Sequence, residues 1–70
     1  MANYYVSKYP QSDGEHEVHS EHCVLLPEKK ERVYLGGFTS SKQAVKKARV
    51  YYARAKACEY CSAKVPGGLI

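Results

Sequence analysis

The sequence predicts an α+β domain in which one long amphipathic helix packs on one face of a three-stranded antiparallel sheet, in the order β-β-β-α. Three observations support this prediction. Two aromatic and β-branched runs flank a loop with Pro and Asp-Gly, a third such run contains two glycines, and the next segment repeats apolar residues every three or four positions. Strands grouped ahead of a helix are typical of α+β folds.

The first two strands are predicted over residues 3–9 and 15–20, joined as a hairpin by the loop "PQSDG". Side chains alternate between the two faces of a strand, so His16 and Val18 share one face of the second strand, and His19 lies on the other with the neighbouring glutamates. Val18 marks the buried face. Taken singly, each histidine of this chain is expected to be a solvated strand residue.

The third strand is predicted over residues 32–38, "RVYLGGF", after a connection that contains Pro27 and a charged turn. Val33 and Leu35 share one face of this strand because they are two residues apart. The two glycines near its end allow the backbone to bend into the next element.

The helix is predicted over residues 40–61. Ser40 and Gln43 match a capping box, in which Ser40 accepts a hydrogen bond from the backbone of Gln43 and the Gln43 side chain reaches back. The apolar stripe with helical spacing consists of Ala44, Val45, Ala48, Tyr51, Tyr52, Ala55 and Cys58.

These elements are expected to form a single domain over residues 1–65, followed by a flexible tail at 66–70. A domain of this size hides only about 60% of the surface that its unfolded chain exposes, so its core is thin. A bound metal or a homodimer would add stability. The predicted core members are Val18, Val33, Leu35, Phe38, Val45, Tyr51 and Tyr52.

Charge is distributed unevenly along the chain. Residues 1–38 carry four basic and six acidic side chains, whereas residues 39–70 carry seven basic side chains and only Glu59 as an acidic one. A basic helix face is able to lie along a phosphate backbone, with a merely solvated surface as the alternative. The predicted nucleic-acid-binding residues are Lys42, Lys46, Lys47, Arg49, Arg54 and Lys56.

The cellular location is predicted from what the sequence lacks. No apolar run approaches the roughly 20 residues that span a bilayer, and no signal-peptide apolar region follows Met1. Three cysteines cannot all pair within one chain. We therefore expect a cytoplasmic protein with reduced thiols and no membrane partner.

A His-x-x-x-Cys pair and a Cys-x-x-Cys pair have the residue types and the spacing of a zinc site, because structural zinc sites combine such pairs from separate segments. The predicted ligands of one structural zinc are His19, Cys23, Cys58 and Cys61, with His16 or His22 as substitutes for His19. A metal-free core is the alternative, since buried cysteine is a common small core residue. A redox pair or a disulfide is a third reading of the same cysteines.

Two resemblances accompany these motifs. The stretches "YYVSK", "GEHEVH", "YLGGFTSS" and "CEYC" resemble, over most of the chain, a group of small bacterial proteins of unknown function, some of which are carried on integron gene cassettes. The segment 19–61 is loosely similar to the zinc-binding module of the Ada DNA-repair protein, which holds one zinc with four cysteines. The first resemblance implies a small bacterial domain, and the second implies a structural zinc.

Catalysis has little support in the sequence, so we do not expect an enzyme. His22 and Cys23 are neighbours that would point to opposite faces of a strand, without a third group to orient them. A Cys-x-x-Cys at the end of a helix lacks the favourable dipole that lowers a thiol pKa at a helix start. We predict a small cytoplasmic binding or adaptor module with an unknown protein partner; the alternative is a zinc-stabilised nucleic-acid-binding domain that uses the basic face of the 40–61 helix.

Overall fold

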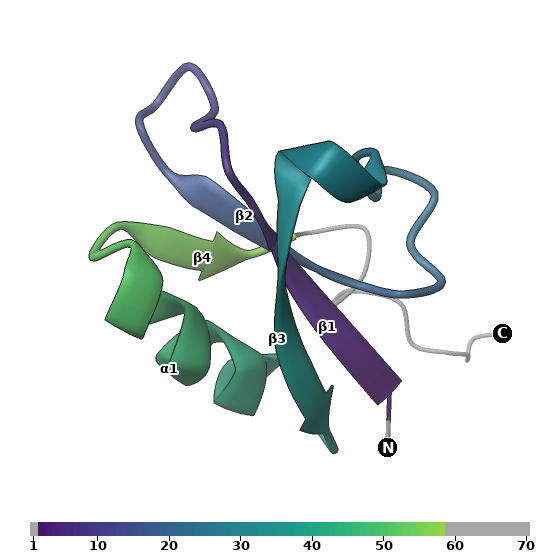
Figure 1. The fold of residues 1–70 in the computed structure, drawn as a ribbon. Helices are drawn as coiled ribbons and strands as arrows, with labels where there is room; N and C mark the ends of the chain where they lie inside the picture. The colour runs from purple at the N-terminus through teal and green to yellow at the C-terminus, as the bar shows by residue number, and fades with distance from the viewer. Residues whose placement is uncertain (1, 59–70) are drawn as a thin grey trace, which may run out of the picture.

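One helix packs on one face of a four-stranded sheet in the computed structural model, which describes residues 2–58 (Figure 1). The strand order is β3-β1-β2-β4, with β1 antiparallel to both of its neighbours and β4 parallel to β2. The predicted α+β class is confirmed, but the sheet gains a fourth strand and is mixed. The elements are β1 (Ala2–Ser7), β2 (His16–Ser20), the short 3-10 helix η1 (Lys29–Glu31), β3 (Arg32–Phe38), α1 (Ser41–Tyr51) and β4 (Ala55–Ala57).

The strand β1 is one of the two inner strands of the sheet. Val6 lies opposite Val18 of β2 on one side and opposite Val33 of β3 on the other, and the side chains of Val6 and Val18 are fully buried. The register against β3 shifts after Tyr4, which pairs with Gly36. Gly36 has a φ of 123°, a backbone conformation that glycine adopts without a steric penalty.

The start of α1 agrees with the predicted capping box in one of its two hydrogen bonds. The Ser40 hydroxyl accepts from the backbone N–H of Gln43 at 3.4 Å. The Gln43 side chain reaches back one residue further than expected, because its Oε1 accepts from both the backbone N–H and the hydroxyl of Thr39, at 3.1 and 2.8 Å. Both bonds fix the point at which the chain leaves β3 and enters the helix.

The predicted helix over 40–61 is wrong for residues 52–58, since α1 ends at Tyr51 and the chain forms β4 instead. A helix over that whole range would be about 33 Å long, whereas the seven residues of β3 span about 23 Å. The 11 residues of α1 span about 16 Å and stay over the sheet. Continuing as a helix would also leave the outer edge of β2 unpaired, and β4 covers that edge.

The core lies between α1 and the sheet. Its buried members are Tyr4, Val6, Val18, Leu35, Ala44, Ala48 and Ala55, with Ala2, Val33, Phe38, Val45 and Tyr52 partly buried against them. Tyr51 was expected in this core but is 51% exposed. The helix ends at this residue, and the chain turns so that Tyr52 rather than Tyr51 faces the sheet, where its ring stacks on His16.

Several predicted features lie outside the described residues. They are Cys61, the end of the domain at residue 65 and the tail at 66–70. Within residues 2–58, no helix combines the length and apolar character that crossing a membrane requires.

We expect Val6→Ala to lower the free energy of unfolding by about 2 kcal/mol, because it removes two buried carbon atoms and leaves a cavity at the centre of the sheet. Val50→Ala makes the same chemical change on α1 at a side chain that is 74% exposed, and should alter stability by less than about 0.5 kcal/mol. Urea unfolding followed by circular dichroism measures both. Equal losses in the two variants would contradict this core.

The β1–β2 loop is joined to β4 by an ion pair whose strength should depend on pH. Lys56 Nζ lies 2.7 Å from Asp13 Oδ2, and this hydrogen bond holds the pKa of Asp13 below its ordinary value. A carboxylate with a depressed pKa stabilises the fold above the pKa of the unfolded chain, near 3.9, and loses that contribution as the pH falls through the folded value.

Asp13→Asn should therefore cause a small loss of stability at neutral pH that disappears below about pH 4. The amide keeps an oxygen that can accept from the backbone N–H of Glu15, so the substitution isolates the charge. Thermal unfolding across this pH range checks the expectation. Glu28→Gln, at an exposed position on the far side of the molecule, is the control and should show no such trend.

Candidate metal centre

His19 lies on the face of β2 that points away from α1. Alternation along the strand places Val18 in the core and His19 on the opposite face, as predicted, but the side chain is only 3% exposed rather than solvated. The imidazole Nδ1 lies 3.5 Å from Cys23 Sγ, and Nε2 lies 3.7 Å from a carboxylate oxygen of Glu17. The ring is therefore placed between a thiol on one side and a carboxylate on the other.

Cys23 reaches this position through a tight turn after β2. Its backbone N–H donates to the carbonyl of Ser20 at 3.1 Å, and its own carbonyl accepts from Leu26 at 3.1 Å. These two successive turns reverse the chain, so that the Cys23 side chain returns to His19, four residues earlier. Cys23 is half-buried in this turn.

Cys58 arrives from a distant part of the sequence and continues the β4 ladder. Val18 is paired with Ala57, and the next backbone N–H, that of Cys58, donates to the carbonyl of Val18 at 2.9 Å. One further step along both parallel strands brings Cys58 beside His19. The Cys58 side chain is 1% exposed.

The three side chains converge with distances suited to a common metal ion. The ligand atoms of His19, Cys23 and Cys58 all lie within 4.8 Å of one another, and the two sulfurs are 3.8 Å apart. A tetrahedral zinc with bonds of about 2.3 Å to sulfur and about 2.05 Å to nitrogen separates two sulfurs by about 3.8 Å and a sulfur from a nitrogen by about 3.6 Å. The sulfur separation also exceeds the roughly 2.05 Å of a disulfide bond.

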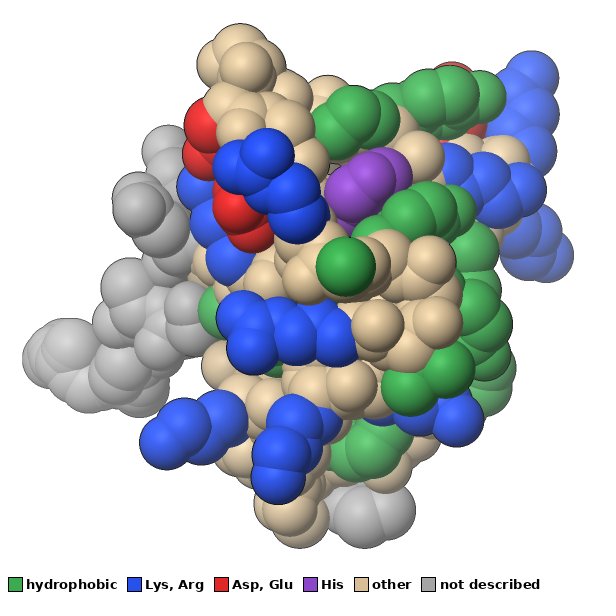
Figure 2. Space-filling view, turned by 90° about the vertical axis from the view of Figure 1, so that its left-hand side faces the viewer, with side chains coloured by type: hydrophobic (Ala, Val, Ile, Leu, Met, Phe, Trp, Pro, Cys, Tyr) green, Lys and Arg blue, Asp and Glu red, His purple; other side chains and the backbone are tan. Residues whose placement is uncertain are grey.

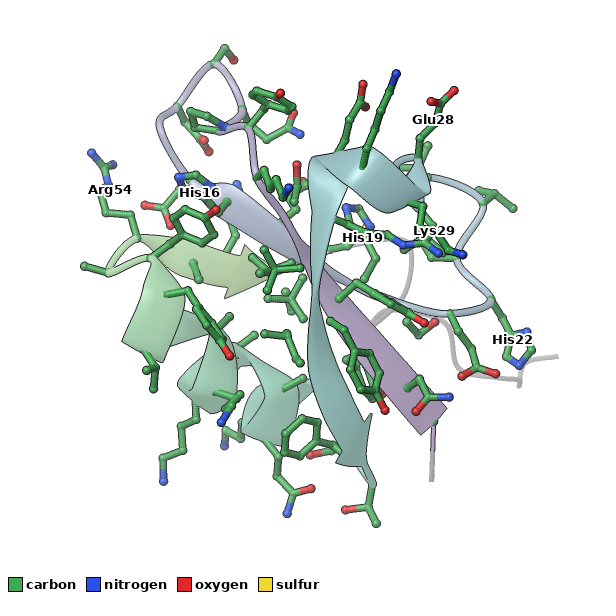
Figure 3. The ribbon with its side chains drawn as sticks, in the orientation of Figure 1. His16, His19, His22, Glu28, Lys29 and Arg54 are labelled. Carbon is green, nitrogen blue, oxygen red and sulfur yellow. The ribbon has the colours of Figure 1, made fainter. Side chains whose placement is uncertain are left out.

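The other two histidines lie elsewhere (Figure 3). His16 is on the helix side of β2, where its ring stacks on Tyr52 at 3.9 Å between centroids and its Nδ1 lies 2.9 Å from the carbonyl of Ser7. His22 points outward from the turn after β2, with its side chain 83% exposed and 3.2 Å from Glu21. Neither belongs to the converging group, so of the three alternatives only His19 joins the cysteines. Cys61, the fourth predicted ligand, lies outside the described residues.

Burial sets the protonation of His19. The loss of water around the imidazole lowers its pKa from the ordinary value, which favours the neutral ring at physiological pH. Neutral imidazole is the form that coordinates a metal, because the ligating nitrogen must carry a lone pair.

Glu17 is the residue of this site that the sequence prediction missed. It lies two positions before His19 on β2, so alternation already placed both on the same face of the strand. A metal-ligating histidine usually donates its other ring N–H to a carboxylate or a carbonyl. Searching for an acidic residue two positions from a candidate histidine on a strand would have identified it.

The predicted nucleic-acid-binding residues divide into two groups. Lys42, Lys46, Lys47 and Arg49 are exposed on α1. Arg54 and Lys56, expected on the same helix, follow its end and form ion pairs with Glu15 and Asp13, at 3.2 and 2.7 Å. The basic helix face is therefore shorter than predicted.

No protein-family model, no curated protein and no solved structure matches this chain.

If His19 coordinates zinc, His19→Ala is expected to weaken zinc binding far beyond the tenfold to 100-fold that loss of an outer-shell partner typically causes, because it removes a predicted direct ligand. His22→Ala should leave the affinity unchanged, since that side chain points into solvent. Competition titration of each variant against a chromophoric zinc chelator measures the affinities. Equal affinities in the two variants would exclude His19 as a ligand.

Proposed function

We propose that this chain is a small binding domain stabilised by one structural zinc ion, with His19, Cys23, Cys58 and Cys61 as its ligands. The observation that carries the proposal is the convergence of the first three. The distances from Cys23 Sγ to His19 Nδ1 and to Cys58 Sγ, 3.5 and 3.8 Å, are those of a tetrahedral zinc site, and all three donor atoms lie within 4.8 Å of one another. The position of Cys61, three residues after Cys58 in the sequence, supports its role as the fourth ligand.

The donor set favours zinc over other common ions. Thiolates and imidazole are soft or borderline ligands that suit zinc, whereas magnesium and calcium prefer carboxylate and carbonyl oxygens. Four protein ligands also leave no position for water or substrate, which is typical of structural rather than catalytic zinc. This supports a binding function over an enzymatic one.

The surroundings of His19 support the same proposal. If Nδ1, the atom nearest Cys23, coordinates the ion, Nε2 carries the ring proton and faces the carboxylate of Glu17. An outer-shell carboxylate fixes the orientation of the ring and raises its basicity as a ligand. The low exposure of His19 and Cys58 keeps both groups away from solvent.

Zinc would link segments that the small core holds weakly. One ligand lies within the sheet, one in the turn after β2 and two at or after the end of β4. In small zinc domains the free energy of metal binding is coupled to folding and reaches about 10 to 16 kcal/mol in peptides. A comparable coupling here would add greatly to the stability of a 70-residue chain.

Protein purified without a chelator or an affinity tag is expected to contain one zinc per chain by native mass spectrometry. Excess EDTA should lower the melting temperature by tens of degrees or unfold the domain, because the ligands lose their shared ion. Absence of bound zinc, together with no response of the melting temperature to added Zn²⁺ or EDTA, would contradict the proposal and favour a metal-free core.

His19→Cys provides the matched variant. It replaces one zinc ligand by another and should keep zinc and the EDTA response, whereas His19→Ala should lose both. If His19 were only a packing residue, the cysteine variant would gain no advantage over alanine. Cys61→Ser tests the fourth ligand in the same assay and should weaken zinc binding.

A further inference from the structure

Three cations form a stripe along α1 beside β4. Lys42, Lys46 and Arg49 are spaced by four and three residues, so they project from the same side of the helix. With Lys56 of β4 they line a groove between α1 and β4, whose other lining residues are Ser41, Gln43, Val45 and Ala57. No acidic side chain is among these lining residues.

The stripe keeps its positive charge within the described part of the chain. Lys42 and Lys46 form no ion pair with residues 2–58. Arg49 donates from Nε and Nη2 to the carbonyl of Ala55, at 3.3 and 3.2 Å, so a neutral acceptor positions the guanidinium and leaves its charge uncompensated. Lys56 is the exception, since Asp13 neutralises it.

The groove lies on a predominantly basic side of the molecule. Figure 2, which views the molecule from the side of α1 and β4, shows Lys and Arg side chains spread over this face and the acidic side chains gathered mainly in one small group. The sequence of α1 itself contains four basic residues and no acidic one. A surface of this kind attracts a polyanion.

We propose that this groove binds the phosphate backbone of a nucleic-acid duplex. From Lys42 to Arg49 the stripe rises about 10 Å along the helix, and its three uncompensated cations each offer one contact to a phosphate of the duplex. The first turn of α1 also lines the groove through Ser41, Lys42 and Gln43, and it brings the positive end of the helix dipole close to it. The proposal rests on the proposed binding function and names its partner.

The lining of the groove favours a duplex over a single strand. Proteins that bind single strands stack bases on aromatic side chains, and this groove has no aromatic lining residue. An aromatic surface exists on the other face of the sheet, where the Tyr5 and Tyr34 rings lie 5.3 Å apart and the Arg32 guanidinium lies 4.4 Å from the Tyr5 ring. That surface is lined by two cations, Lys29 and Arg32, against the four that line the groove. Its Arg32 guanidinium is already engaged by the Tyr5 ring and by the carbonyl of Pro27, at 2.8 Å.

Fluorescence anisotropy with labelled 20-base-pair DNA and RNA duplexes, using the protein as purified, tests the proposal. About three phosphate contacts predict that the logarithm of affinity falls with the logarithm of salt concentration with a slope near −3. Lys46→Gln should reduce this slope by about 1 and weaken binding roughly tenfold at about 50 mM salt. Lys47→Gln removes the same charge from the adjacent residue, which does not line the groove, and should have a much smaller effect.

Several results would overturn the proposal. These are absence of duplex binding at about 50 mM salt, equal effects of Lys46→Gln and Lys47→Gln, equal affinity for polyglutamate, and tighter binding of a single strand that Tyr34→Ala abolishes. Zinc content is measured on the same preparation. Zinc-loaded protein that does not bind duplexes would contradict only the proposed duplex binding in the groove. Folded, zinc-free protein that binds duplexes would contradict only the proposed metal centre.

Discussion

The parallel pairing of β4 with β2 is the contact on which the rest of this structure depends. Three residue pairs, from His16 with Ala55 to Val18 with Ala57, join the two strands. This pairing ends the helix, buries Ala55 in the core and brings Cys58 next to His19. Without this pairing, Cys58 would not lie beside His19 and Cys23.

So short a strand needs support from outside its own ladder. The stacking of His16 on Tyr52 fixes the chain where it leaves α1, and the ion pairs of Arg54 and Lys56 with the β1–β2 loop hold the start and middle of β4. Exposed ion pairs each contribute only about 0 to 1 kcal/mol. The far end of the strand is followed directly by Cys58, where a shared metal ion would hold it most effectively.

The sequence predicted the elements whose local signals agree with each other. Alternation around Val18 assigned the correct faces of β2, and the Ser40–Gln43 pair located the start of α1. The prediction from the sequence failed for β4. Ala55 and Cys58 are three residues apart, which continues a helical stripe, and alanine favours helices. The competing signal, Ala55 alternating with Lys56 and Ala57, is too short to decide; the length of the sheet and the open edge of β2 decide it instead.

Three of the four predicted metal ligands lie close together in the structure, although the fold that presents them was only partly predicted. Their residue types and spacing placed His19, Cys23 and Cys58 in one predicted set, with Cys61 as the fourth member and His16 or His22 as substitutes for His19. The set could be predicted even though Cys58 was placed on the wrong kind of element, because the two local pairs meet whenever β2 and the segment after α1 are neighbours. The choice among the three histidines came from the structure, which places His16 on the core side of β2, where its ring stacks on Tyr52. The burial of His19 could not be predicted from the sequence, because it depends on the turn that brings Cys23 back to the strand.

The two proposed sites both depend on β4 and the residue that follows it, so a change at one site is expected to affect the other. Cys58, at one end of that segment, faces the metal centre, while Lys56 and Ala57 form one side of the basic groove. The carbonyl of Ala55 holds the Arg49 guanidinium in the groove. An ion that fixes Cys58 to His19 therefore also fixes the side of the groove opposite α1, so metal binding on one face of the sheet would order the basic surface on the other.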